Sequence, residues 1–337
     1  MITRDEFIAG FDAPSTQMNA KSVFKRFDQY LATKKSDEKE FFDKMNMVEQ
    51  SDRARKIREI QNFWLDSGNS VNTIKVYRSF LLEWLEENDI TISPLKLKKL
   101  AKIPKRLNEM PYTPDTKTVL KIIHKLSLED ATFCIIQATS AMRQGEVHDL
   151  RVCDIDFDHT PTMIRIKAEN TKTRTERLTF LTPEASKMLK KLIKNKNISD
   201  QDRIFTKHMT VYHANLRVVL RKLGLDDKFV TGRMKMSLHR FRAAANQAIT
   251  EAVDPRYADV IKGHISGLRT YDAGDLKKMS RDYKKAVPLL TLDKTQQLEE
   301  LQEKEGNKDA TQDIMIREIE NLKLEMERIK DSQVKQD

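Results

Sequence analysis

The chain has 337 residues, enough for about two domains, and its composition excludes several classes of protein. Glycine and proline occur only 9 times each, which excludes collagen-like and low-complexity chains. No run of about 18 apolar residues occurs, so we expect no transmembrane helix, and the N-terminal residues lack the pattern of a signal peptide. Cys134 and Cys153 cannot form a disulfide framework and have no Cys or His at zinc-ligand spacing. We therefore expect a cytoplasmic protein without a structural zinc site.

Positive charge is concentrated in the body of the chain. The sequence contains 61 Lys and Arg against 51 Asp and Glu, a net charge of +10. Residues 294–337 hold 8 basic and 12 acidic residues, so residues 1–293 carry a net charge of +14. A basic body with an acidic tail favours a polyanionic partner, with nucleic acid preferred over a membrane surface because no amphipathic basic anchor is evident. The alternative explanation is that the positive charge only keeps the protein soluble and has no polyanionic partner.

Residues 1–105 are predicted to form a small all-helical domain. Apolar residues recur there at helical spacing, as in Val23, Phe24, Phe27, Tyr30 and Leu31. Helices are also expected at 54–66, from Asn72 or Thr73 onward, and at 92–102. Three prolines then mark a linker at about 103–115.

Residues 111–293 are predicted to form a second domain that is mainly helical with a small β-sheet. Helices are expected at about 115–127 and 128–142. The runs 163–168 and 177–181 indicate a β-hairpin with a turn at Asn170. Further helices are expected from Pro183, at 210–223 and at 238–252, the last with Ser237 as its N-cap.

Residues 294–337 are predicted to form an acidic helical tail. Its apolar residues follow spacings of 4, 3, 4 and 3, at Met315, Ile319, Leu322, Met326 and Ile329. That is a heptad seam, but it covers only about two heptads. Self-association through the tail and an amphipathic helix that packs on its own body both stay open.

Several short motifs in the second domain contain residues that suit phosphate binding. Arg143 and Glu146 follow an apolar helix, and Lys172 lies at the hairpin turn. His239 and Arg242 are spaced i, i+3, so they share one helical face at a helix start. Each motif alone is also typical of an ordinary helix end or an exposed basic surface.

The order of these motifs resembles that of the tyrosine recombinase (phage integrase) family. Arg-x-x-Glu, a hairpin Lys, His-x-x-Arg, Gly-His at Gly263-His264 and a following Tyr271 occur in succession. The resemblance covers residues 111–293. Residues 1–105 look like the core-binding, DNA-binding domain of that family, because residues 72–77 are similar to its T-x-x-x-Y helix. The tail is similar to that of archaeal and archaeal-virus members.

The resemblance implies roles for six catalytic residues. Arg143 and Arg242 would grip the scissile phosphate with guanidinium forks that stay charged. His239 would position the phosphate and exchange protons with the nucleophile, and His264 would donate a hydrogen bond to it.

The remaining two residues would make and break bonds. Lys172 would protonate the departing 5′-oxygen, and Tyr271 would attack phosphorus to form a 3′-phosphotyrosyl enzyme. Glu146 would support the site by packing and hydrogen bonding. Such chemistry needs neither a metal nor ATP, so no cofactor is expected.

Two features depart from the family pattern. His-x-Leu-Arg-His is replaced by His239-Arg240-Phe241-Arg242-Ala243, and the tyrosine lies seven residues after His264 where nine is common. Tyr283 therefore stays open as an alternative nucleophile. Lys172, Arg174 and Arg177 could in addition touch the DNA backbone near the hairpin.

The predicted function is site-specific DNA recombination, with integration or excision of a virus or mobile element preferred over chromosome-dimer resolution. The expected partners are double-stranded DNA and three further copies of the chain in a homotetramer, with no membrane and no small-molecule substrate. The alternatives are a DNA-binding protein of the same fold without catalysis, and a strand-passing enzyme of the type IB topoisomerase kind. A third alternative is that the motifs occur together by chance in a helical protein with a purely structural role.

Overall fold

The computed structural model describes residues 2–105, 109–171, 174–264 and 273–293. The chain divides into two compact units, Met1–Met110 and Pro111–Asp337. The predicted tail at 294–337 lies outside the described residues.

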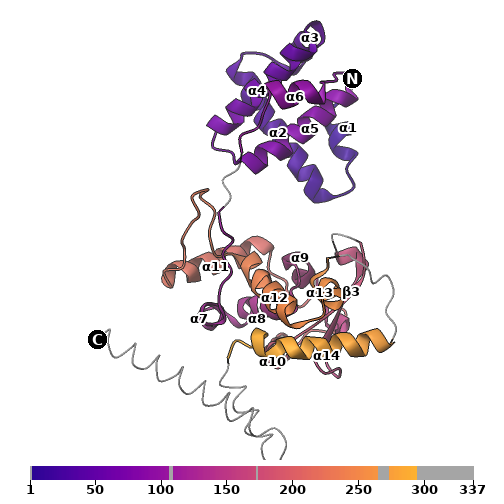
Figure 1. The fold of residues 1–337 in the computed structure, drawn as a ribbon, viewed down its shortest axis with the longest axis vertical. Helices are drawn as coiled ribbons and strands as arrows, with labels where there is room; N and C mark the ends of the chain where they lie inside the picture. The colour runs from indigo at the N-terminus through magenta and orange to yellow at the C-terminus, as the bar shows by residue number, and fades with distance from the viewer. Residues whose placement is uncertain (1, 106–108, 172–173, 265–272, 294–337) are drawn as a thin grey trace, which may run out of the picture. The chain divides into compact units, whose positions relative to one another are not determined.

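The first unit is a bundle of helices, seen in violet in Figure 1. Its helices are α1 (Arg4–Ala9), α2 (Pro14–Thr33), α3 (Glu38–Met47), α4 (Gln50–Asp66), α5 (Val71–Glu87) and α6 (Pro94–Leu100). The helix expected from Asn72 or Thr73 begins at Val71. Ser70 is its N-cap, and the Ser70 hydroxyl accepts a hydrogen bond from the Thr73 backbone N–H at 3.2 Å.

Aromatic side chains fill the centre of this unit. Trp64 and Trp84 are completely buried. The Trp84 ring meets those of Phe24 and Phe42 edge to face, at centroid distances of 5.0 and 4.9 Å. Such contacts add to the free energy gained by burying the rings.

The second unit is built around one buried helix. Its helices are α7 (Thr116–Lys125), α8 (Leu128–Ser140), α9 (Gln144–His148), α10 (Pro183–Lys196), α11 (Met209–Lys222), α12 (Leu238–Ala252), α13 (Pro255–Lys262) and α14 (Ala273–Leu290), with 3₁₀ turns η1 (Val152–Asp154) and η2 (Ala168–Asn170). Every residue of α8 from Asp130 to Ser140 is buried, and α7, α10 and α12 pack against it. Ser237 is the N-cap of α12, as predicted, although its hydroxyl makes no capping hydrogen bond.

A three-stranded antiparallel sheet completes this unit. Its strands, in spatial order, are β1 (Ile155–Asp156), β2 (Met163–Ile166) and β3 (Arg177–Phe180). Met163 pairs with Phe180 and Ile166 with Arg177, so the predicted hairpin is confirmed. The two-residue strand β1 was not predicted, because it is too short to show alternation. The expected class, mainly α with a small β-sheet, is confirmed.

In the part of the chain that the structure describes, no helix has the length and apolar character needed to cross a membrane.

Candidate active site

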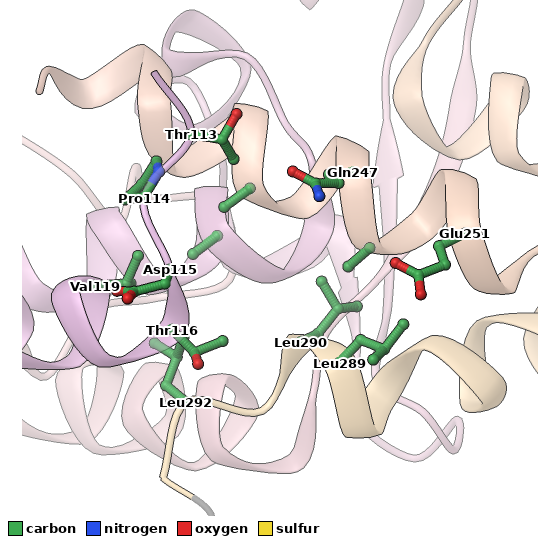
Figure 2. Close-up of a pocket in the computed structure, with 13 residues that line it drawn as sticks. Thr113, Pro114, Asp115, Thr116, Val119, Gln247, Glu251, Leu289, Leu290 and Leu292 are labelled. Atoms are coloured by element: carbon green, nitrogen blue, oxygen red, sulfur yellow. The ribbon is translucent and has the colours of Figure 1, made fainter. Parts of the chain in front are cut away.

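A pocket of about 300 Å³ in the second unit is a poor candidate for binding a polyanion. Figure 2 shows it beside α7, α12 and the end of α14. The charged residues that line it are Asp115 and Glu251, both acidic. The predicted site residues lie elsewhere in this unit.

The described site residues come from three helix ends. Arg143 is the N-cap of α9, directly after a turn in which Ala141 adopts a left-handed conformation (φ 56°). His239 and Arg242 lie in the first turns of α12, and His264 follows the C-terminus of α13. Lys172 and Tyr271 lie outside the described residues.

Glu146 joins the arginines of the site. Its carboxylate accepts hydrogen bonds from the Arg143 backbone N–H at 2.6 Å, from Arg143 Nη1 at 2.9 Å and from Arg177 Nη2 at 2.6 Å. Arg242 Nη1 lies 3.8 Å from the same carboxylate. Burial by itself raises the pKa of Glu146, but the charges of Arg177 and Arg143 outweigh it, so this pKa lies below its ordinary value. Glu146 is therefore a buried anion that holds three cations, the supporting role expected for it.

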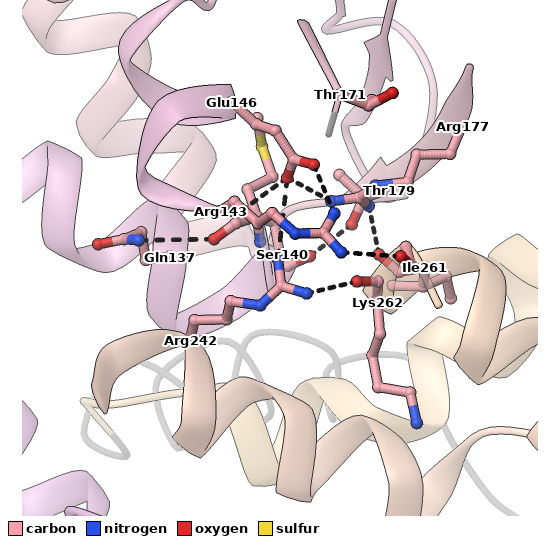
Figure 3. Close-up of polar contacts among 12 residues, drawn as sticks. Gln137, Ser140, Arg143, Glu146, Thr171, Arg177, Thr179, Arg242, Ile261 and Lys262 are labelled. Carbon is pink, nitrogen blue, oxygen red and sulfur yellow. Dashed lines mark hydrogen bonds and ion pairs between the residues drawn. The ribbon is translucent and has the colours of Figure 1, made fainter. Parts of the chain in front are cut away.

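The same three arginines also bind the C-terminus of α13. Three successive backbone carbonyls each accept a hydrogen bond from a different guanidinium, as Figure 3 shows. The pairs are Arg177 with Ile261, Arg242 with Lys262 at 2.6 Å, and Arg143 with Gly263 at 3.0 Å. Carbonyls at a helix C-terminus lack partners within the helix and form the negative end of its dipole. The end of α13 is thus fixed by the arginine cluster.

Gly263 is required at this point for two reasons. Its φ is +68°, a left-handed conformation that side chains disfavour. A Cβ atom there would lie 2.6 Å from Arg177 Nε and 3.0 Å from Arg143 Nη1. The glycine lets the chain pass directly beside the arginines.

The cluster carries more positive charge than its own carboxylate neutralises. Three guanidiniums face one glutamate, which leaves an excess of two charges. Burial, and then repulsion from Arg143 and Arg177, lowers the pKa of Arg242 to about 10. Arg242 Nη1 is buried and makes no hydrogen bond in the described structure. The side chain of Arg143 is 30% exposed, so solvent reaches the cluster at this residue. An oxyanion from outside the protein could therefore bind to the cluster.

The two histidines are more exposed than the arginines. Burial first, and then the charges of Arg242, Arg240 and Arg233, lower the pKa of His239. Burial and the charge of Lys262 lower the pKa of His264, whose backbone N–H caps α13 by donating to the Asp259 carbonyl at 2.8 Å. Both imidazoles therefore stay neutral to lower pH than a free histidine does.

Tyr283, the alternative nucleophile, has a structural role. Its side chain is completely buried in α14, and its hydroxyl donates to the Thr139 carbonyl at 2.9 Å. Burial also raises the pKa of this hydroxyl well above its ordinary value. A phosphate outside the protein cannot reach it.

Arg177 is the residue whose place the sequence analysis got wrong. We expected it beside Lys172 and Arg174 on the DNA-facing hairpin, but its side chain is 5% exposed and bound to Glu146. The available signal was the alternation of β3, because Arg177 shares a face with Thr179, which is buried and donates to the Ser140 carbonyl. An arginine on the buried face of a strand needs an acidic partner, and Glu146 is that partner.

Among the residues that the structure describes, no group of three or more His, Cys, Asp or Glu side chains could hold a metal ion.

Known proteins share both the sequence pattern and the fold. Residues 112–272 match the phage integrase family. Tyrosine recombinase XerA of Saccharolobus solfataricus (strain ATCC 35092 / DSM 1617 / JCM 11322 / P2) is 27% identical over 158 residues, which are 46% of this chain and 49% of that protein. The match thus spans about half the length of this curated relative.

Two solved structures are similar in fold. The Tn1549 transposon integrase in complex with transposon right end DNA has a TM-score of 0.58 at 16% identity, covering 83% of this chain and 99% of the other. The XerH recombinase in its post-cleavage complex has a TM-score of 0.50 at 17% identity, covering 71% and 69%. The family match thus covers residues 112–272, and the fold of the chain is similar to that of these two structures.

Proposed function

We propose that the protein cleaves and rejoins double-stranded DNA through a covalent 3′-phosphotyrosyl intermediate. The observation that carries the proposal is the buried cluster of Arg143, Arg177 and Arg242 around Glu146, with its excess of two positive charges. A phosphodiester carries one negative charge, and the pentavalent transition state of its cleavage carries two. A cluster with this excess stabilises the transition state more than the ground state, which is the requirement for catalysis.

The described groups suit separate steps of this reaction. Arg143 and Arg242 would bind the non-bridging oxygens, with Arg242 Nη1 donating the hydrogen bond that it lacks within the protein. His239, kept neutral by its lowered pKa, could accept the proton of the attacking hydroxyl. His264 would donate a hydrogen bond to the phosphate. Tyr271 as nucleophile and Lys172 as general acid are carried over from the motif.

Exposed lysines support a DNA-binding role for the first unit. Lys98, Lys99, Lys102 and Lys105 are exposed on α6 and just after it, where they could contact phosphates. We assign residues 1–105 to DNA binding, residues 111–293 to catalysis and residues 294–337 to assembly. The Tn1549 relative is a transposon integrase, which favours integration or excision of a mobile element. We propose in addition that the reaction takes place in the cytoplasm and that a homotetramer carries it out.

The decisive experiment is a search for the covalent adduct. The protein is mixed without metal with nicked DNA duplexes that carry candidate sites, quenched with detergent and digested, and the nucleotide-bearing peptide is identified by mass spectrometry. We expect the adduct on Tyr271 and its loss in Tyr271→Phe. Tyr283→Phe is the matched control and should form the adduct, because the buried Tyr283 hydroxyl serves packing.

Other outcomes would replace the proposal. DNA binding on a cognate site without any adduct would identify a binding protein that lacks catalysis. An adduct formed by a monomer on supercoiled DNA without sequence preference would identify a topoisomerase-like enzyme. Deletion of 294–337 should change the oligomer size on DNA more than the rate of cleavage, and an unchanged oligomer would remove the assembly role.

A further inference from the structure

We propose that Arg177 is a positioning residue of the catalytic site, which keeps Arg242 available to the scissile phosphate by holding the Glu146 carboxylate away from it. The inference rests on the proposed function, because it concerns the phosphate that this site would bind.

Arg177 does not reach DNA itself. Its side chain is 5% exposed, and its two terminal nitrogens donate to the Glu146 carboxylate and to the Ile261 carbonyl. Arg143, by contrast, keeps 30% of its side chain exposed. Any effect of Arg177 on the reaction must therefore pass through the groups that it touches.

The first of these groups is the carboxylate of Glu146. Oε2 accepts from Arg177 at 2.6 Å but lies 3.8 Å from Arg242 Nη1, which is too far for a hydrogen bond. Arg242 Nη1 consequently keeps an unused donor in the buried site. Without Arg177, Oε2 would lose the guanidinium that holds it and could close on Arg242, whose Nη1 already lies 3.8 Å away. An arginine paired with the protein's own carboxylate is a weaker ligand for phosphate.

The second group is the C-terminus of α13. Arg177 binds the Ile261 carbonyl, and its Nε would lie 2.6 Å from a Cβ at position 263. Arg177 therefore holds the end of α13 next to β3. In that position Arg143 and Arg242 donate hydrogen bonds to the next two backbone carbonyls of the same helix end. One planar fork spans both anchors, which a lysine, with a single nitrogen, cannot do.

The test is Arg177→Lys, measured in the adduct assay at saturating DNA. We expect the rate of adduct formation to fall roughly 10- to 100-fold, because small displacements of catalytic groups have effects of this size. DNA affinity should fall by much less than the rate, because Arg242 supplies only one of the many phosphate contacts that hold DNA. Arg165→Lys is the matched control: Arg165 pairs with Glu176 through two hydrogen bonds on the neighbouring strand but is exposed, so its rate should equal that of the wild type.

A neutral substrate separates positioning from a loss of stability. A methylphosphonate at the scissile position carries no charge, so its cleavage depends less on a free Arg242. The defect of Arg177→Lys should shrink to a few-fold on this substrate, whereas partial unfolding would slow both substrates equally. Thermal unfolding shows whether Arg177→Lys is folded. If it is not, the experiment uses Arg177→Gln, because the glutamine amide can still donate a hydrogen bond to Glu146.

Two results would overturn the inference: a wild-type rate for the variant, or an equal defect on both substrates. The wild-type adduct on Tyr271, measured in the same experiment, reports on the proposed function alone. A failure of that function is thereby distinguished from a failure of the role of Arg177.

Discussion

The two units of the chain are stabilised in contrasting ways. Among the described residues of the first unit, Gln61 is the one polar side chain in the core, which otherwise consists of aromatic and aliphatic groups. The second unit has its own apolar core around α8 but also buries Glu146, Arg177 and Arg242 in one cluster. The first unit gains free energy by removing apolar surface from water.

The charged cluster cannot be explained by stability. Burying an arginine or a glutamate costs several kcal/mol of hydration, which close pairing only about offsets. Three arginines around one carboxylate repel one another, and the pKa of Arg242, lowered to about 10, reflects that repulsion and its burial. An arrangement that is unfavourable in the free protein and becomes favourable when an anion binds is typical of a functional site.

Trp84→Ala tests the apolar side of this contrast and should have the largest effect on stability. The variant removes a completely buried ring and its edge-to-face contacts, so we expect a loss of about 4 kcal/mol in the free energy of unfolding. Hydrogen exchange read by mass spectrometry should show the lost protection in 2–105, with 111–264 retained. Met47→Ala, at an 85% exposed position, is the control. Equal loss in both units would mean that they unfold together.

Glu146→Gln tests the charged side. It keeps the shape of the side chain but leaves three arginines without their anion, and we expect the second unit to lose about 3 kcal/mol. Glu40→Gln, which breaks an exposed pair with Lys44, should cost at most about 0.5 kcal/mol. Urea unfolding of the two variants measures the difference. Equal costs would show that water reaches the cluster and screens its charges.

Gly263→Ala tests whether the backbone at Gly263 must lie directly beside Arg177 and Arg143. Gly224→Ala is its matched control, because both glycines have a positive φ, +68° and +64°, but a Cβ at Gly224 would meet nothing within 4 Å. Each variant should lose about 1–2 kcal/mol from the left-handed conformation. Gly263→Ala should in addition displace Arg177 and Arg143, so that it alone slows adduct formation. Equal rates for the two variants would contradict the packing of the glycine against the cluster.

Much of the fold follows from local patterns in the sequence. The hairpin, and α12 within Leu238–Ala252, agree with their predicted ranges because alternation and helical spacing mark them directly. The start of α4 at Gln50 was missed, since residues 50–53 are all polar and therefore add no apolar residue to the helical spacing. The fold class depends on such local features and was predicted correctly.

The site was harder to predict because its contacts are distant in sequence. Arg143 and Glu146 are neighbours on one helix start, which the sequence shows, but Arg177 meets Ile261 across 84 residues. Carbonyl acceptors carry no sequence signal at all, since every residue has one. The sequence therefore identified the charged residues by type, and their hydrogen bonds to the end of α13 appear only in the folded chain.

Changes in pH should have the smallest effect of those predicted here. They act through His239, an exposed histidine of the site. Burial and neighbouring arginines lower the pKa of His239 below its ordinary value of 6.5. Between that value and the lowered one, the unfolded chain binds a proton that the folded chain does not, so the contribution of His239 to stability is lost as the pH falls through this window.

The same shift predicts how the rate responds to acid. If neutral His239 accepts a proton in the reaction, adduct formation at low DNA concentration should stay constant as the pH falls to 6.5 and decline only below it. His213→Gln is the matched control, because burial and Arg217 also lower the pKa of His213, on α11. Removing His213 should change stability at acid pH and leave the rate profile as it was, whereas His239→Gln should remove the acid limb of the profile. An acid limb that persists in His239→Gln would assign the proton to another group and limit His239 to binding the phosphate.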